Sequence, residues 1–230
     1  MYRKQQGFTL VEIAIVLVII GLLLGGVLKG QELINSAKIK NIANDLNGIT
    51  AAVYTYQDRY KALPGDDLDA TTKARWSAVP TPGGNQNGKI DILAGTAGCA
   101  FNSNAATDEC VTFWMDLRAA GLIGGDPASA VLPQNAVGGI MGVQNNAGLS
   151  TTTSYIAGLV VCTSNLDGKI AGAIDAQFDD GKPNKGNILG FEQAGSVTPG
   201  SAQPTAGDTS LLLAYSESDT SKLYTVCKKQ

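Results

Sequence analysis

The chain has 230 residues, a formal net charge of −3, 16% charged residues, four cysteines and no histidine. Without histidine, a Ser-His-Asp or Cys-His catalytic set is impossible, as is a histidine-ligated metal site. The slightly acidic balance gives no basic surface for nucleic acid. The length is enough for one or two domains with a buried core.

Residues 8–28 form an apolar run of membrane-spanning length. The segment is FTLVEIAIVLVIIGLLLGGVL, and its one charged residue is Glu12. As a helix rising about 1.5 Å per residue it spans about 30 Å, the thickness of a bilayer core. A secretory signal peptide has a shorter apolar region and ends in small residues, whereas Lys29-Gly30-Gln31-Glu32 follows this run, so we expect it to be retained. A carboxylate inside such a span is costly, and we therefore expect Glu12 to be functional.

A specific pattern stands at the start of the run, Lys4-Gln5-Gln6-Gly7-Phe8-Thr9-Leu10-Val11-Glu12. It resembles the prepilin signature of type IV pilins and of the pseudopilins of type II secretion, a short basic leader ending in Gly and followed by Phe-Thr-Leu-(Ile/Val)-Glu and an apolar helix. The resemblance covers Arg3 to about Leu28. It implies that a membrane-embedded prepilin peptidase cuts between Gly7 and Phe8 on the cytoplasmic side, and that the same class of enzyme methylates the new amino group of Phe8.

The chemistry of these positions agrees with that processing. Gly7 has no side chain to obstruct a protease at the membrane surface. Glu12 lies one helical turn after Phe8, so in a filament the carboxylate of one subunit can pair with the amine of its neighbour. Such a pair offsets the desolvation of both charges and fixes the axial register between subunits. The alternative is that Glu12 lies at the headgroup level of a plain anchor. Basic residues near the ends of the span do not favour an inside amino terminus, so the orientation follows from the resemblance.

The helix is expected to continue beyond the span, from Phe8 to about Lys61. Apolar residues step by three or four positions through its second half, at Ile39, Ile42, Leu46, Ile49, Val53, Tyr56 and Tyr60. Leu63-Pro64-Gly65 then ends it. We accordingly divide the chain into a leader (1–7), a transmembrane or filament-core helix (8–28), an amphipathic half (29–62) and a head (63–230).

Three glycines interrupt the apolar run, at Gly21, Gly25 and Gly26. Each weakens a helix by about 1 kcal/mol, which favours a kink or local melting in a filament. They equally allow the close approach of neighbouring helices. Many pilins carry a proline near the position of Lys29, and this chain does not.

The head is polar, rich in turns and expected to be α+β. The expected helices are Asp66–Trp76, Asp108–Ala120 and Leu166–Phe178. The expected strands are Tyr155–Thr163, Asn187–Gln193, Leu211–Ser216 and Lys222–Lys228, with a turn cluster at Pro80–Asp91 and a weakly patterned stretch at Gly125–Gly148. Strands separated by short turns predict an antiparallel sheet packed on the long helix. This is the type IV pilin fold that the resemblance implies.

All four cysteines, at positions 99, 110, 162 and 227, follow the span. An even number outside the inner membrane suggests two disulfides, with three possible pairings. We favour Cys99–Cys110, which closes a short loop onto the expected helix at 108–120, and Cys162–Cys227, which ties the first expected strand to the C-terminus. Cys227 also resembles the terminal cysteine that closes the receptor-contact loop of many pilins. The C-x-x-C spacing of zinc sites is absent.

Three clusters of acidic and amide residues are candidates for calcium. None has the order of an EF-hand loop, and Asp, Asn and Gly are also the residues that tight turns select. We therefore expect turns and no metal site, with Asp179, Asp180 and Asn184 kept as weak calcium candidates. The clusters are Asp66, Asp67 and Asp69; Asn85, Asn87 and Asp91; and Asp179, Asp180, Asn184 and Asn187.

These features predict a structural subunit with no cofactor and no enzymatic activity. The nucleophile elbow, the Walker loop and the dinucleotide glycine fingerprint are all missing. The resemblance implies a homo-oligomeric helical filament, assembled by a pilus or secretion platform from a precursor stored in the inner membrane with its head in the periplasm. A surface pilus of this kind serves cell adhesion and twitching motility. The alternatives are a pseudopilin of type II secretion, built from the same parts, and a membrane-tethered adhesive or binding domain that does not polymerise.

Overall fold

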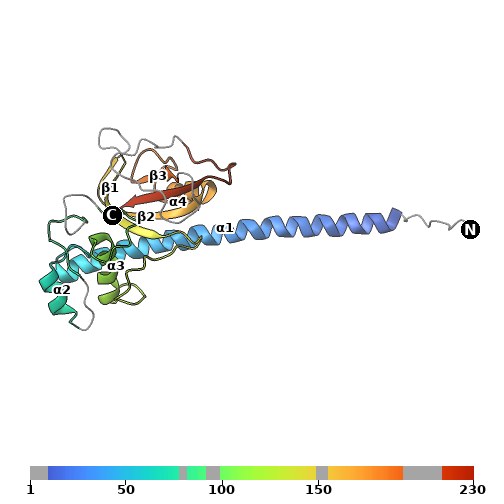
Figure 1. The fold of residues 1–230 in the computed structure, drawn as a ribbon. Helices are drawn as coiled ribbons and strands as arrows, with labels where there is room; N and C mark the ends of the chain where they lie inside the picture. Colours follow the sequence, from blue (N-terminus) through green and yellow to red (C-terminus); the bar gives the residue numbers. More distant parts are fainter. Residues whose placement is uncertain (1–9, 78–81, 92–98, 149–154, 194–213) are drawn as a thin grey trace, which may run out of the picture. The chain divides into compact units, whose positions relative to one another are not determined.

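A computed structural model describes residues 10–77, 82–91, 99–148, 155–193 and 214–230 (Figure 1). The chain divides into two compact units, residues 1–38 and 39–230, and the boundary falls inside the first helix. The leader, with Gly7 and Phe8, lies outside the described residues. The elements in chain order are α1 (Leu10–Tyr60), α2 (Asp69–Arg75), α3 (Glu109–Ala119), β1 (Met141–Gly148), β2 (Tyr155–Asp167), α4 (Gly168–Phe178), β3 (Ile188–Glu192) and β4 (Leu223–Lys229).

Helix α1 confirms the expected long N-terminal helix over its described part. It continues without a break through the three glycines, and a Cβ atom added at any of them would meet nothing within 4 Å. It ends where Lys61 adopts a left-handed backbone (φ 57°), three residues before Pro64, which cannot continue a helix. Gly65, at φ 86°, is required next, because a Cβ there would overlap the backbone carbonyl of Glu109.

The sheet has four antiparallel strands in the order β1-β2-β4-β3. Together with α1 it makes an α+β fold consistent with the type IV pilin fold. Strand β1 was not expected, because its sequence MGVQNNAG has no alternation of apolar and polar residues. Its pairing with β2, from Met141 opposite Thr163 to Gly148 opposite Tyr155, supplies the backbone partners that make it a strand.

Two expected boundaries in the head are wrong. Leu166 and Asp167 belong to β2, and α4 begins at Gly168, because the Asp167 side chain caps that helix by accepting the Ile170 N–H at 2.8 Å. Helix α2 begins at Asp69. Asp66 and Asp67 lie in the turn before it, where Asp66 accepts the Gly88 N–H and Asp67 pairs with Arg75 of the helix.

The prediction of a strand at 211–216 is also wrong at residues 214–216. Residues 211–213 lie outside the described part, and residues 214–216 are not a strand. Tyr215 instead donates its hydroxyl to Asp175 on α4 at 2.7 Å, and its ring meets that of Tyr224 edge to face. This side-chain anchor replaces ladder pairing.

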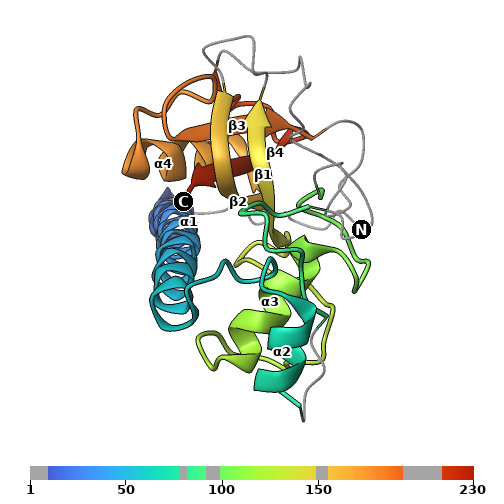
Figure 2. The same cartoon turned by 90° about the vertical axis from the view of Figure 1, so that its left-hand side faces the viewer.

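The two faces of the sheet pack into two hydrophobic clusters, as strand alternation requires. Val161 and Val226 face the larger cluster, which contains the buried stripe of α1 together with residues of α3 and α4. Cys162 and Cys227 face the smaller one, with Phe101, Ile156 and Phe191. Figures 1 and 2 show α2 next to α3, and α4 against the sheet. The stripe of α1 consists of Ile42, Leu46, Ile49, Val53 and Tyr56.

Candidate functional site

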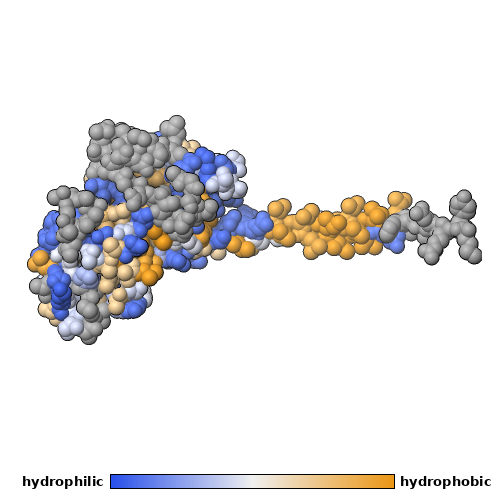
Figure 3. Space-filling model, in the orientation of Figure 1, coloured by the Kyte–Doolittle hydropathy of each residue, from blue (hydrophilic) through white to orange (hydrophobic). Residues whose placement is uncertain are grey.

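The first part of α1 presents its apolar side chains without cover. Among residues 10–38 no side chain is buried, and Leu10 is 91% and Leu22 is 73% exposed. Figure 3 shows a long run of apolar residues along much of this part of the helix, followed by a hydrophilic stretch. Of the described residues, α1 is the one helix long and apolar enough to cross a membrane, with a mean hydropathy of 2.8 over its best window. Membrane anchors and signal sequences share this length and composition. The residues at the N-terminal end of the helix are therefore needed to tell the two classes of segment apart.

Glu12 lies in the first turn of α1. The next charged residues along α1 are Lys29 and Glu32, which form an exposed ion pair with each other at 2.7 Å. Glu12 is therefore the one charged side chain within the apolar part of the helix, at residues 10–28.

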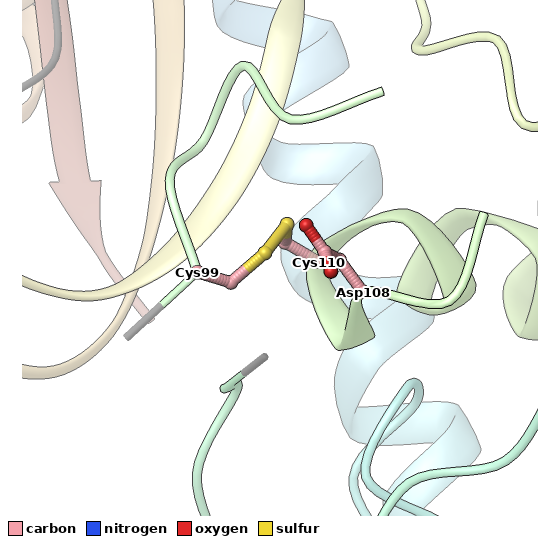
Figure 4. Close-up of side chains that lie close together, drawn as sticks. All are labelled: Cys99, Asp108 and Cys110. Carbon is pink, nitrogen blue, oxygen red and sulfur yellow. A yellow bond between two sulfur atoms is a disulfide. The ribbon is translucent and has the colours of Figure 1, made fainter. Parts of the chain in front are cut away.

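The head is closed by two disulfides, and they are the pairs favoured from the sequence. Cys162 and Cys227 are directly opposite each other on β2 and β4, so their bond joins two central strands. Cys99 is joined to Cys110 in the first turn of α3, close to Asp108 (Figure 4). These two sulfurs and Asp108 are near enough to one another to hold a metal ion, but sulfurs bonded to each other are not thiolate ligands.

The first set of calcium candidates lies around the turn at residues 83–91. Asp66 accepts the backbone N–H groups of Asn87 at 3.0 Å and Gly88 at 2.7 Å. Glu109, which is fully buried, accepts those of Asn85 at 3.1 Å and Asp91 at 2.6 Å. The carboxylates thus hold this turn by accepting backbone N–H groups, the chemistry expected of a turn cluster. Burial raises the pKa of Glu109 to about 7.

The second set lies between α4 and β3. Asp179 accepts backbone N–H groups from Asn187 and, at 3.2 Å, from Ile188. Asp180 forms an ion pair with Lys185 at 3.2 Å and accepts the Lys182 N–H. Asn184 lies in the same described turn. Calcium binding by Asp179, Asp180 and Asn184 stays a weak sequence-based prediction.

Asp67, which belongs to the same candidate cluster as Asp66, has a different role. Asp67 is 3% exposed at its side chain and forms an ion pair with Arg75 at 2.5 Å. The guanidinium of Arg75 also lies over the ring of Tyr60, 4.2 Å from its centroid. This arrangement joins α2 to the C-terminal end of α1.

Two charged residues, Glu109 with a clear structural role and Asp45 at a cavity, were missed from the sequence. Glu109 looked like an ordinary first-turn acid of α3, and its burial depends on the turn at 83–91 folding over it. Asp45 stands on α1 beside a cavity whose wall is drawn from several distant segments. The sequence did contain one indication for Asp45, because it is a single acidic residue next to the apolar stripe of α1.

Comparison with known families identifies the N-terminal segment. Residues 2–28 match the model of the prokaryotic N-terminal methylation motif, which is the type IV pilin and prepilin signature. No curated protein matches the chain. The motif marks structural proteins, and with an apolar helix directly behind it, it fits a membrane-anchored precursor. It supports a type IV pilin-like or pseudopilin precursor.

Proposed function

We propose that the chain is the structural subunit of a type IV pilus. The precursor lies in the inner membrane through residues 8–28, with its head in the periplasm. A prepilin peptidase removes the leader after Gly7 and methylates Phe8. An assembly platform then moves the apolar helix from lipid into a bundle of identical helices, where it forms the filament core. The observation that carries the proposal is the methylation motif placed directly before an exposed apolar helix.

The exchange from lipid to bundle is energetically reasonable. Lipid tails and neighbouring apolar helices are similar solvents for these side chains, so the transfer is nearly balanced and packing decides it. Gly21, Gly25 and Gly26, which have open space around them in the single chain, permit helices to approach closely. Cleavage before the apolar run leaves the helix on the product, so membrane insertion and polymerisation use the same segment.

In this proposal Glu12 fixes the axial register between neighbouring subunits. Cleavage creates a positive amine at Phe8, one turn before Glu12, and the Glu12 carboxylate of one copy pairs with this amine of the next. Either charge alone in an apolar bundle is costly, whereas the pair is tolerated.

The first test is mass spectrometry of the mature N-terminus, where we expect a methylated Phe8. Electron microscopy should then show surface filaments that disappear when the gene is deleted. Loss of protein secretion without loss of filaments would instead identify a pseudopilin. An uncut leader would identify a non-polymerising anchor.

The second test replaces Glu12. We expect Glu12→Leu to be processed normally but to leave no surface filaments. Glu32→Leu is the matched control, since Glu32 is an exposed acid of the same helix beyond the apolar run, and it should assemble. Normal filaments from processed Glu12→Leu chains would refute the register role.

A further inference from the structure

Asp45 and Lys40 are charged residues in the second half of α1 that have no oppositely charged partner within the helix. Helical partners lie three or four residues away. The corresponding neighbours of Asp45 are Asn, Ile, Gly and Ile, and those of Lys40 are Ser, Ala, Ala and Asn. Lys29 pairs with Glu32 in this way, and Asp58 pairs with Lys61 directly after the end of α1.

Asp45 and Lys40 also cannot pair with each other in one chain. Five positions turn about 140° around a helix, so the two side chains leave different sides of α1. Among the described residues neither forms an ion pair or a hydrogen bond. Each charge is therefore available to another molecule.

Asp45 stands at a cavity of about 270 Å³ whose other walls are mainly apolar. It is the one charged residue of the lining. Although Asp45 is exposed, its partial desolvation beside the cavity raises its pKa above the ordinary value. A lysine fits such a site, since its four-carbon stem covers apolar surface while its ammonium reaches the acid. The apolar walls include Ile49, Trp114, Leu122, Ile123, Pro133 and Met141.

The axial shift between neighbouring copies in the proposed filament indicates which lysine can reach Asp45. Pairing Glu12 with the Phe8 amine of a parallel copy displaces the two copies by about four helical positions, or about 6 Å. Lys40 precedes Asp45 by five positions, or about 7.5 Å along the axis, a difference that a lysine stem covers. In both pairs the acid lies about one turn C-terminal to the cation.

We propose that the cavity beside Asp45 receives the Lys40 side chain of a neighbouring copy of this chain. The resulting ion pair sets the register of the heads, as the Glu12 pair sets the register of the apolar helices. The contact joins two different surfaces of identical subunits, so it repeats from copy to copy and does not close into a dimer. This inference rests on the proposed function, because it requires copies that polymerise in parallel.

Cysteine crosslinking tests the contact in assembled filaments of the full chain. We expect the double variant Asp45→Cys/Lys40→Cys, treated with a bismaleimide crosslinker about as long as the lysine stem that it replaces, to give a ladder of dimers, trimers and higher species on a gel, since each copy offers both halves of the contact and the two thiols are too far apart for a direct disulfide. Each single variant should give no ladder. Filaments that form from the double variant without a ladder, or a ladder from Asp45→Cys paired with Lys89→Cys in its place, would overturn the proposal.

Charge reversal gives an independent readout. We expect Asp45→Lys or Lys40→Asp to reduce the assembled fraction by about fivefold, and the two together to restore it, as for a directly coupled pair. Lys89→Asp, a reversal on an exposed loop residue, should have no effect. Equal losses in the single and double variants would overturn the pairing. Absence of filaments from the unmodified chain would reject the proposed function itself, which distinguishes the two failures.

Discussion

The two halves of α1 have the same backbone and opposite surroundings. In residues 39–60 the apolar stripe is buried by the head, and its members are at most 6% exposed. In residues 10–38 no side chain is buried, although these residues are the more apolar. The second half is therefore stabilised within the chain, whereas the first half depends on another molecule. Substitutions in the head should therefore change the free energy of unfolding and leave membrane retention intact.

The largest effect is expected from removing the Cys162–Cys227 disulfide. This bond closes a loop of 65 residues between two central strands. Constraint of the unfolded chain by a loop of this size contributes about 4 kcal/mol. We expect Cys162→Ala/Cys227→Ala to lower the free energy of unfolding by about this amount, measured by urea unfolding of the detergent-solubilised chain. The variant should still be retained in the membrane fraction.

The second disulfide provides the matched comparison. Cys99–Cys110 closes a loop of 11 residues, for which the same reasoning gives about 3 kcal/mol. A larger loss from Cys99→Ala/Cys110→Ala than from the Cys162 and Cys227 variant would contradict loop closure as the source of stability.

The buried ion pair between α2 and α1 is expected to contribute next. Arg75→Met keeps an apolar stem but leaves the Asp67 carboxylate in a buried position, with the Tyr56 hydroxyl at 3.3 Å as its remaining side-chain partner. Breaking a buried pair in this way costs about 3 kcal/mol. Lys73→Met is the control on the same helix, because its pair with Asp69 is exposed and should contribute less than about 0.5 kcal/mol. Equal losses in the two variants would mean that burial does not govern these pairs.

Glu109 should make the stability of the head depend on pH. Its pKa is about 7 in the folded chain against an ordinary value of 4.5, so the folded state binds the extra proton between these values. Stability from this group is then present below about pH 4.5 and is lost as pH rises through 7, by about 2 kcal/mol. Glu109→Gln does not ionise, so its stability should fall less between pH 5 and 8 in urea titrations. Exposed Glu217→Gln should keep the slope of the unmodified chain, and an unchanged slope in Glu109→Gln would refute the assignment.

The parts of the fold that were predicted correctly carry strong local patterns. Helix α1 shows a long apolar run and then a regular stripe, and β4 lies within one residue of the strand expected at 222–228. Strand β1 could not be predicted, because MGVQNNAG is a strand only through its pairing with β2. The strand prediction at 211–216 was wrong at residues 214–216 for the opposite reason. An apolar run ending in Tyr215 suggested a strand, but the Tyr215 hydroxyl is bound by Asp175 of α4.

The same distinction applies to the candidate site. The processing motif and Glu12 are consecutive in the sequence, so they could be recognised without a structure. The cavity beside Asp45 could not, because its walls come from α1, α3 and the segments at 122–124 and 133–141. Only folding brings these residues together.

The smallest effect is expected at Tyr215. Its hydroxyl donates to the buried Asp175 at 2.7 Å, and burial raises the tyrosine pKa, so it remains a donor. We expect Tyr215→Phe to lower the free energy of unfolding by about 1 to 2 kcal/mol, since the carboxylate loses a partner that water does not replace. Tyr54→Phe is the control, because Tyr54 is 58% exposed on α1 and should change stability by less than about 0.5 kcal/mol.

The Tyr215 variant also gives the closest test of whether the head and the apolar half of α1 are independent. Burial raises the pKa of Asp175 to about 6, and the hydrogen bond from Tyr215 opposes that rise. Its loss should therefore raise the Asp175 pKa further and shift the pH at which this carboxyl loses its proton upward, measurable by NMR titration. Because this change is confined to residues of the head, we expect the proposed methylation of Phe8 and the proposed assembly into filaments to be the same as in the unmodified chain. A loss of filaments with an intact head would show that the head and the apolar half of α1 are coupled, contrary to the separation argued from their burial.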